Sequence, residues 1–507
     1  MISFELLAVL TLVILAFGDL IVGVVNDAVN FLNSAIGSKV TSRKVILIVA
    51  SIGIIIGTTF SDGIIEVARK GIFHPEFFSA TEVITIFAAV ALSDIILLDL
   101  YSTFGLPTST TVSIVFELLG AAFIFALLKV GNMEQAWEAI NSASAMKIVV
   151  GIVLSIGIAF FSGLIVQFFT RLIFTFNYKP RIKKWGAVWS GVALTSLLFF
   201  ILMKGAKHAT FMTNDIKEFI NGHTLEILLS TFVTLSVISY GLIKKNVNIL
   251  KVIVLIGTAS LAMAFAGNDL ANFIGVSIAG TSAFLGADLT GELPTPTWVL
   301  LLAGIIMIVA IWRSKKAKTV SATEINIASH EKHIKSMWKT NVLTQKFIDL
   351  SIFIFKTITY PIPESIKAWI SKRWKTTKET NENGAAFDLV RASVNLMVAA
   401  AVISYATSQK LPLSTTYVTF MVAMGTSLAD GVWNRDCAPS RISGVLTVIS
   451  GWFLTAIVAF LLSGVIVGIL FFGKTYGLIA AILFVGFTIY KLSHLHDKRE
   501  KTAKMKA

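Results

Sequence analysis

The sequence predicts an all-α polytopic membrane protein with about twelve transmembrane helices. Its two related halves are expected to place broken or re-entrant half-helices at one central site. An apolar composition and an internal repeat carry this prediction. Of the 507 residues, 55% are hydrophobic and 14% are charged, and the mean hydropathy is +0.80. A soluble domain carries about 25% charged residues, so the composition excludes an ordinary soluble protein.

Long apolar runs recur along the chain. A helix of roughly 18 or more apolar residues crosses a hydrocarbon core about 30 Å thick. Lipid offers the backbone no hydrogen-bond partner, so such runs must become helices. We therefore expect a multi-pass protein of the lipid bilayer, in a bacterial inner (plasma) membrane. The clearest runs are residues 44–59, 83–98, 148–169, 225–243 and 442–472.

The N-terminal apolar stretch, residues 6–17, is expected to be the first membrane helix. It has neither the basic leader nor the small-residue cleavage site of a secretory signal peptide. The chain holds one cysteine, Cys437, which excludes an intramolecular disulfide and a cysteine-based metal cluster. Chemistry at membrane depth must therefore come from other polar side chains.

The net charge is +14, and the lysines and arginines gather between the apolar runs. In a soluble protein this excess would suggest nucleic acid as a partner. Here the positive-inside rule accounts for it, because cytoplasmic loops of membrane proteins are rich in Lys and Arg. Residues 171–184 and 244–251 are candidates for the cytoplasmic side, and we expect no nucleic-acid partner.

The largest shift in composition covers residues 313–387, which are basic and polar. We interpret this segment as a cytoplasmic insertion. Within it, residues 342–359 are apolar but interrupted by charges, which favours an amphipathic helix on the membrane surface. The predicted division of the chain is a first-repeat core (1–130), intervening transmembrane helices (131–248), the first part of the second-repeat core (249–312), the insertion (313–387), the second part of that core with the last helix (388–492) and a basic tail (493–507).

Two short motifs occur twice, in the same order. Residues 25–31, Val-Asn-Asp-Ala-Val-Asn-Phe, resemble residues 267–273, Gly-Asn-Asp-Leu-Ala-Asn-Phe, at an offset of 242 residues. Residues 106–111, Leu-Pro-Thr-Ser-Thr-Thr, resemble residues 411–416, Leu-Pro-Leu-Ser-Thr-Thr, at an offset of 305 residues. The basic insertion lies between the two motifs of the second half, and its length is close to the difference between the two offsets. One duplicated unit with a loop added to its second copy accounts for both offsets.

The Asn-Asp-x-x-Asn motif is a candidate cation site. A carboxylate at membrane depth costs on the order of 2.5–3.5 kcal/mol, so Asp27 and Asp269 need partners. The sequence places no Lys or Arg within a helical turn of either, and hard cations prefer carboxylate and amide oxygens. Hydrogen bonding between helices is the alternative role. The predicted cation ligands are Asn26, Asp27, Asn30, Asn268, Asp269 and Asn272.

The Leu-Pro-x-Ser-Thr-Thr motif is a candidate anion site because it predicts a helix start. Proline is tolerated in the first turn, where its missing N–H would have no partner. Free N–H groups and the positive end of the helix dipole attract an anion there. Ordinary capping by Ser and Thr is the alternative role. The predicted anion-binding residues are Ser109, Thr110, Thr111, Ser414, Thr415 and Thr416.

Together the two motif types predict transport of an oxyanion coupled to a cation. Phosphate keeps a proton at neutral pH and can donate it to Asp27 or Asp269, whereas sulfate cannot, which favours phosphate. ATPase, hydrolase and zinc-protease motifs are absent from the sequence, so we expect no enzyme. The other acids at membrane depth are Asp19, Asp62, Asp94, Asp99, Glu117 and Asp430. Val422 stands at the repeat position of Glu117, which favours a structural or gating role for that glutamate.

The paired motifs resemble those of the inorganic phosphate transporter (PiT) family. Residues 26–30 look like its first signature and residues 267–272 like its second, and both Pro-x-Ser-Thr-Thr elements match family motifs. The resemblance covers residues 17–120 and 252–472. It implies two inverted repeats and cotransport of phosphate with sodium or protons. The first signature departs from the family's usual Asn-Gly-Phe-His opening, since Gly-Val-Val-Asn precedes the aspartate here.

We therefore expect a secondary active transporter that imports inorganic phosphate, coupled to a cation gradient. Sodium is the expected coupling ion, and no organic cofactor is expected. Proton-coupled phosphate transport and a sulfate permease of the same family are the alternatives within transport. A non-transporting membrane phosphate sensor, whose basic loop binds a cytoplasmic partner, is the alternative of another class. The sequence leaves a homodimer open.

Overall fold

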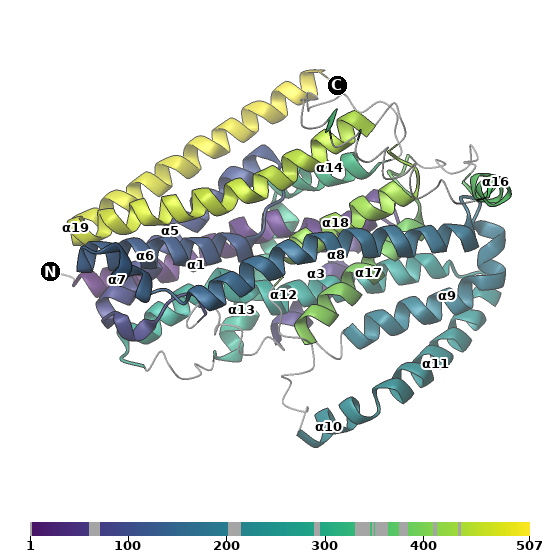
Figure 1. The fold of residues 1–507 in the computed structure, drawn as a ribbon, viewed down its shortest axis with the longest axis horizontal. Helices are drawn as coiled ribbons and strands as arrows, with labels where there is room; N and C mark the ends of the chain where they lie inside the picture. Colours follow the sequence, from purple (N-terminus) through teal and green to yellow (C-terminus); the bar gives the residue numbers. More distant parts are fainter. Residues whose placement is uncertain are drawn as a thin grey trace.

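The computed structural model describes residues 3–59, 71–200, 214–287, 295–329, 345–346, 349, 363–374, 384–408, 413–433 and 438–506. These parts of the chain form helices and no β-strand (Figure 1). Within them, 8 helices are long and apolar enough to cross a membrane, or up to 9 if a bent pair forms one span. This confirms the all-α polytopic membrane fold. The expected count of about twelve helices and the inversion of the two halves stay predictions.

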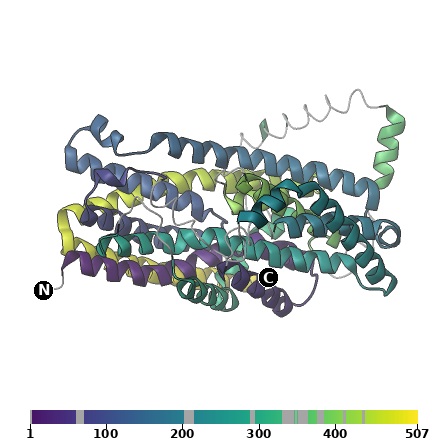
Figure 2. The same cartoon turned by 90° about the horizontal axis from the view of Figure 1, so that it is seen from below.

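Most helices lie side by side along one direction, and both views show them as a single bundle (Figures 1 and 2). Their order and bounds are α1 (Phe4–Asp27), α2 (Val29–Gly37), α3 (Arg43–Thr59), η1 (Pro75–Phe77), α5 (Ala80–Phe104), α6 (Thr110–Val130), α7 (Met133–Glu138), α8 (Ser142–Phe174), α9 (Lys179–Phe200), α10 (Asn214–Gly222), α11 (Thr224–Lys244), α12 (Ile249–Phe284), α13 (Thr297–Arg313), α14 (Lys316–Ala328), α16 (Glu364–Arg373), α17 (Leu389–Ser408), α18 (Thr415–Ala429) and α19 (Ala438–Lys506).

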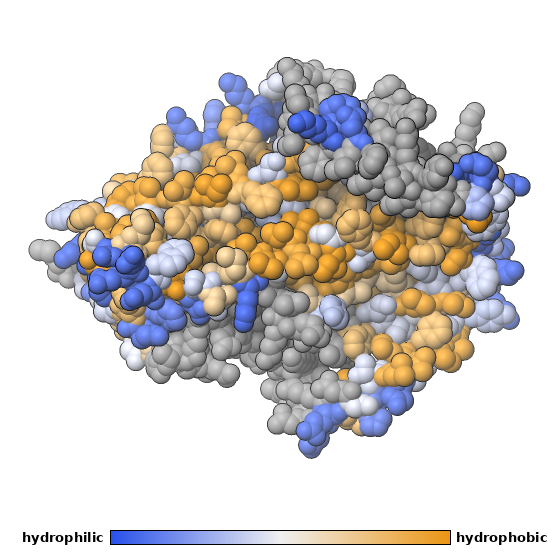
Figure 3. Space-filling view, viewed as in Figure 1, coloured by the Kyte–Doolittle hydropathy of each residue, from blue (hydrophilic) through white to orange (hydrophobic). Residues whose placement is uncertain are grey.

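The outer surface has the character of a membrane protein. Apolar side chains cover its middle, and hydrophilic side chains gather toward the two ends of the bundle (Figure 3). Phe161 on α8 and Leu461 on α19 are each 58% exposed. Exposed apolar area of this extent is unfavourable in water and is expected where lipid tails are the solvent.

The first Ser-Thr-Thr motif forms the tip of a helical hairpin made by α5 and α6. The α5 helix begins with a capping box between Ser79 and Glu82 and ends at Gly105, whose φ of 69° suits a glycine in the left-handed region. The α6 helix returns, and its Lys129 forms an ion pair with Glu82 at 2.8 Å. The start of α5 and the end of α6 therefore lie together, and we call this end of the hairpin its base. The tip residue Ser109 is 1% exposed, so the hairpin enters the protein and turns back inside it.

The second Ser-Thr-Thr motif begins α18, which pairs with α17 in a second hairpin. Asp388 directly precedes α17 and Asp430 caps the end of α18, so both carboxylates mark the hairpin's base. Arg171 of α8 joins them. It donates to both oxygens of Asp388 at 2.8 and 2.9 Å and to both oxygens of Asp430 at 2.8 Å. Each hairpin thus has its open end closed by an ion pair.

The bases of the two hairpins lie at opposite ends of α8. Lys129 also donates to the carbonyl of Phe77, close to where the segments 72–74 and 139–141 pair directly before α8 begins. Arg171 lies in the last turn of the same helix. At about 1.5 Å per residue, roughly 45 Å of helix separates the two bases. The hairpins therefore enter from opposite ends of the bundle, and their tips approach one another in the interior.

Repeat-related glycines hold each hairpin against a long helix from a distant part of the chain. Gly120 of α6 lies so close to α19 that a Cβ there would be 2.2 Å from the Phe460 carbonyl oxygen. Gly425 of α18 is offset by the same 305 residues as the motif, and a Cβ there would be 2.1 Å from the Phe160 carbonyl oxygen of α8. Small residues allow such close backbone approach between membrane helices. The α19 helix then folds back at Lys474, where φ is 42°, into two arms (Figure 1).

Part of the segment predicted as a cytoplasmic insertion packs in the bundle. After a 71° bend from α13, α14 buries Val320, Ser321 and Glu324. The last carbonyls of α14 accept hydrogen bonds from two buried arginines, Arg391 and Arg441. By contrast, α16 buries no residue and lies at one end of the bundle, where its Arg373 donates to the carbonyl of Leu172 of α8 (Figures 1 and 2). Most of the amphipathic helix expected at 342–359 lies outside the described residues, and the division of the chain into segments stays a prediction.

Candidate functional site

The Asn-Asp motif of the first half lies between the tips of both hairpins. Asp27 ends α1, and its side chain is fully buried. Its Oδ2 accepts a hydrogen bond from Thr110 Oγ1 at 2.9 Å, and its Oδ1 accepts one from Thr416 Oγ1 at 3.0 Å. One carboxylate therefore joins the first helical residues of α6 to those of α18.

The second motif makes the corresponding contacts. Asp269 Oδ2 accepts from Thr415 Oγ1 at 3.0 Å, which is the repeat equivalent of the contact between Asp27 and Thr110. Unlike the first motif, which lies where α1 gives way to α2, Asp269 lies inside the continuous helix α12. A helix break, which could supply unwound carbonyls, is thus not present at the second motif.

The two asparagines at the end of the motifs reach across to the opposite half. Asn30 Nδ2 donates to Thr416 Oγ1 at 3.0 Å, and Asn272 Nδ2 donates to Thr111 Oγ1 at 3.1 Å. Thr416 and Thr111 are repeat equivalents, so the exchange is reciprocal. Asn272 also donates to Asp269 Oδ1 at 3.2 Å. Asp27, Asn30, Asp269 and Asn272 therefore meet the threonines of both Ser-Thr-Thr motifs in one place.

Both predicted helix starts are present. Ser109 caps α6 by accepting from the N–H of Val112, and Ser414 caps α18 by accepting from the N–H of Tyr417, each at 3.2 Å. The serines thus take the capping role, and three of the threonines that follow, Thr110, Thr415 and Thr416, donate to the motif carboxylates. The first N–H groups of each helix have no partner within that helix, which leaves two N-termini facing the same buried site.

Asn26 holds the tip of the first hairpin. Its Oδ1 accepts from the N–H of Thr108 at 2.9 Å, and its Nδ2 donates to Ser102 Oγ and to the carbonyl of Leu106. In this arrangement its amide fixes the turn and is not directed at Asp27. The side chain of its repeat equivalent, Asn268, lies outside what the structure describes.

Thr419 belongs to the site, although the motif comparison did not single it out. Its Oγ1 donates to Asn30 Oδ1 at 3.2 Å, and its side chain is buried. The signal was its spacing, since Thr419 follows Thr415 by four residues and so lies on the same face of α18.

The site concentrates negative charge. Asp27 and Asp269 are 0% and 2% exposed and lie close enough to repel one another. Among the described residues, no Lys or Arg forms an ion pair with Asp27. Burying like charges is unfavourable unless a cation or proton compensates them. The arrangement therefore suits a cation between the motifs, with hydroxyl and N–H donors beside it for an anion.

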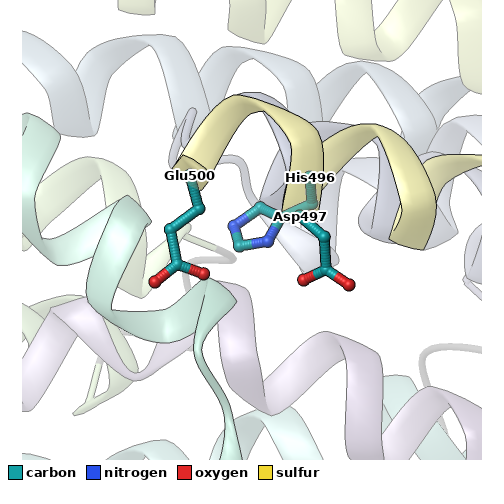
Figure 4. A group of neighbouring side chains, drawn as sticks. All are labelled: His496, Asp497 and Glu500. Carbon is teal, nitrogen blue, oxygen red and sulfur yellow. The ribbon is translucent and has the colours of Figure 1, made fainter. Parts of the chain in front are cut away.

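A second group of metal-capable side chains lies near the end of α19. His496, Asp497 and Glu500 bring their ligand atoms within 4.8 Å of one another (Figure 4). His496 Nε2 lies 3.2 Å from Thr319 Oγ1, which ties α19 to α14. Asp497 is exposed on a basic helix end. The group is far from the motifs in sequence, and a structural contact accounts for its one buried member.

A family model described as "Phosphate transporter family" matches residues 23–322. This range contains both Asn-Asp motifs and the first hairpin. It ends within α14, before the second hairpin begins.

Relatives and a solved structure extend the similarity over most of the chain. A protein of Thermococcus kodakarensis that carries the name phosphate permease is 26% identical over 88% of this chain and 93% of its own length. A phosphate permease by name from Helicobacter pylori is 28% identical over 59% of this chain and 56% of its own length. A solved structure titled "The sodium-dependent phosphate transporter" aligns with a TM-score of 0.65 at 19% identity, over 91% of this chain and 98% of the other. At this identity the structure shows a shared fold.

Proposed function

Because this chain belongs to the phosphate transporter family, we propose that it is a secondary active transporter that imports inorganic phosphate together with sodium. The observation that carries the proposal is the meeting of two helix N-termini and two buried aspartates at one site. Substrate sites of transporters built from internal repeats lie where half-helices of the two repeats meet. The hairpin tips and the crosswise hydrogen bonds of Asn30 and Asn272 have this arrangement.

Phosphate binding is assigned to the tips of the hairpins. Thr110, Thr111, Thr415 and Thr416 carry four hydroxyls, and Ser109 and Ser414 start the two helices. Three of these hydroxyls donate to Asp27 or Asp269 in this structure, and we propose that they turn to phosphate when a cation takes their place on the carboxylates. A tetrahedral anion has four oxygens, which two facing clusters of donors can satisfy from opposite sides. The dipole of each helix adds a favourable field of partial positive charge at its N-terminus.

Cation binding is assigned to the Asn-Asp motifs. With phosphate bound nearby, Asp27 and Asp269 would face further negative charge, so the anion is tolerated only when a cation neutralises the carboxylates. Sodium suits a set of carboxylate and amide oxygens, which Asp27, Asp269, Asn30 and Asn272 can supply. The amide oxygen of Asn26 accepts from the N–H of Thr108 and is left out of this set. Mutual neutralisation of the two ligands is the physical basis that we propose for coupling.

Selection of phosphate over sulfate follows from the protons of phosphate. A phosphate hydroxyl can donate to Asp27 or Asp269, whereas sulfate would bring an unprotonated oxygen against the same acceptor. A buried acceptor left without a donor makes this discrimination steep. Competition by sulfate is therefore expected to be weak.

Uptake by proteoliposomes tests the proposal. Purified protein is reconstituted, and entry of radioactive phosphate is followed with sodium inside and outside, with an inward sodium gradient, and with a pH gradient alone. We expect accumulation that requires the sodium gradient and resists excess unlabelled sulfate.

Two results would overturn parts of the proposal. Uptake driven by the pH gradient without sodium would replace sodium by protons as the coupling ion. The absence of phosphate flux under every gradient, with specific phosphate binding retained, would favour a membrane sensor. Empty liposomes and the Asp27→Asn variant provide the controls.

A further inference from the structure

A buried acidic cluster lies beside the central site, in the first half only. It consists of Asp19 on α1, Asp94 on α5 and Glu117 on α6, which are 3%, 2% and 0% exposed. Ser113 Oγ contacts both Asp94 and Glu117. Gly18, the residue before Asp19, packs so closely against α5 that a Cβ there would lie 2.6 Å from Cδ1 of Ile95, the residue after Asp94. None of the three acids is a member of either repeated motif.

The hydrogen bonds inside this cluster are incomplete. Ser113 Oγ lies 2.7 Å from Asp94 Oδ1 and 3.0 Å from Glu117 Oε1, but a hydroxyl has one hydrogen to donate. Only one of the two carboxylates can therefore receive it. Two further oxygens, Asp19 Oδ1 and Glu117 Oε2, are buried and have no hydrogen-bond partner among the described residues.

The described basic side chains of the neighbouring helices form ion pairs with acids outside the cluster. Lys129 of α6 pairs with Glu82 at 2.8 Å, and Lys316 of α14 pairs with Asp99 of α5 at 2.6 Å. No described Lys, Arg or His lies within ion-pair distance of the cluster. The remaining charged group that faces it is Asp27, which Asp94 repels.

The second half shows that the fold does not need these acids. The repeat positions of Asp19, Asp94, Ser113 and Glu117 are occupied by Leu261, Ala399, Val418 and Val422. All four of these side chains are apolar and at most 4% exposed. Apolar side chains thus fill the equivalent positions of the second half, so the fold does not require acids there. The acids of the first half therefore have another role.

We propose that Asp19, Asp94 and Glu117 form a second cation site, which takes a sodium ion or a proton. Several buried carboxylates without basic partners are stable only when cations or protons neutralise them. Chains of Asp and Glu at membrane depth mark ion pathways and proton relays. Asp19 precedes Asp27 by two turns of α1, and Glu117 follows Thr110 by two turns of α6, so the cluster lies between the central site and the base of the first hairpin. A cation that enters from that end meets this cluster before it meets Asp27.

Cation binding to the purified full-length protein in detergent tests the inference without reference to the cargo. Binding of radioactive sodium is counted per protein, and proton uptake on acidification is measured with an indicator dye. The test variant is Asp19→Asn/Asp94→Asn/Glu117→Gln. The matched control is Asp99→Asn, which removes a buried carboxylate of α5 that already has a lysine partner.

If the site takes sodium, the triple variant binds fewer sodium ions per protein than the wild type and the control. If it takes a proton, the sodium count is unchanged, and the triple variant takes up fewer protons than the control. Equal sodium and equal proton binding in all three proteins would overturn the inference. Should the triple variant fail to fold, Asp94→Ala/Glu117→Val, which carries the second-half residues, gives the same readouts.

Discussion

Asp27 and Thr416 are 389 residues apart in the chain, yet Thr416 Oγ1 donates to Asp27 Oδ1 at 3.0 Å. The acceptor belongs to the Asn-Asp motif of the first half, and the donor to the Ser-Thr-Thr motif of the second. Through this hydrogen bond, a change in the position or charge of the Asp27 carboxylate acts directly on the first turn of α18. The same carboxylate holds Thr110 of α6, so it connects the tips of both hairpins.

The variant Asp27→Asn is expected to weaken the binding of the coupling ion. It keeps the shape of the side chain but removes the charge, while the amide oxygen can still accept from one threonine. A hydrogen bond or ion contact to a charged group contributes about 1.5–3 kcal/mol, which corresponds to roughly a 10- to 150-fold higher sodium concentration for half-maximal uptake. The measurement is phosphate uptake by proteoliposomes as a function of sodium. Asp269→Asn should behave alike, whereas unchanged sodium dependence in both variants contradicts their role.

The variant Thr416→Val is expected to lower phosphate affinity. Valine keeps the volume but removes the hydroxyl, which leaves Asp27 Oδ1 and Asn30 Nδ2 without this partner. The change in affinity comes from the loss of a hydroxyl donor to the charged phosphate, which costs about 1.5–3 kcal/mol, or roughly 10- to 150-fold in affinity. Titration of phosphate binding gives the value. Thr85→Val is the control, because Thr85 is also buried but bonds only to the carbonyl of Thr81 in its own helix.

Replacement of Arg171 by Met is expected to destabilise the protein and not merely to slow transport. Arg171 is fully buried, and its guanidinium is the bridge between Asp388 and Asp430 at the base of the second hairpin. Removal of one partner from a buried ion network costs about 3–5 kcal/mol, because uncompensated charge remains. Arg171→Lys should rescue little, since an ammonium cannot bond both carboxylates in the bidentate manner.

Thermal unfolding of the purified protein in detergent measures this effect. The control Lys367→Met removes the exposed pair with Glu364, which contributes at most about 1 kcal/mol. An Arg171→Met protein as stable as this control would show that the base of the second hairpin does not depend on the arginine.

The membrane fold and the meeting of the repeated motifs could be predicted from the sequence, because both show in local patterns, whereas the binding roles of the motif residues stay predictions. Apolar runs set the helices, and repetition indicated that Asp27, Asp269 and the Ser-Thr-Thr segments act together. Ser109 and Ser414 could be placed at helix starts because capping is a matter of neighbouring residues.

The pairing of these residues could not be predicted, because it depends on contacts between distant segments. Composition grouped Arg171 with the basic residues of cytoplasmic loops, whereas the structure buries it between two aspartates. Similarly, the polar sequence of α14 indicated a solvated insertion, although Glu324 and Val320 face the bundle. A polar residue inside a membrane protein is satisfied by a partner, and the sequence does not show which one.

Gly120→Ala and Gly425→Ala are expected to destabilise the protein by similar amounts. An added Cβ would lie 2.2 Å from the Phe460 carbonyl oxygen in the first case and 2.1 Å from that of Phe160 in the second. A backbone carbonyl of a packed helix cannot yield as a flexible side chain can, so α6 or α18 must move outward. Overpacking of this kind costs about 1–3 kcal/mol. Both helices begin at the central site, so their displacement should also separate the two threonine clusters and reduce phosphate affinity.

Gly468→Ala on α19 is the matched control, because an added Cβ there meets nothing within 4 Å. Alanine is the better helix former by about 1 kcal/mol, so this variant should be as stable as the wild type or more so. Thermal unfolding and phosphate titration of all three variants separate the two effects. If Gly120→Ala and Gly425→Ala retain wild-type stability and affinity, the site does not depend on the close packing of α6 against α19 and of α18 against α8.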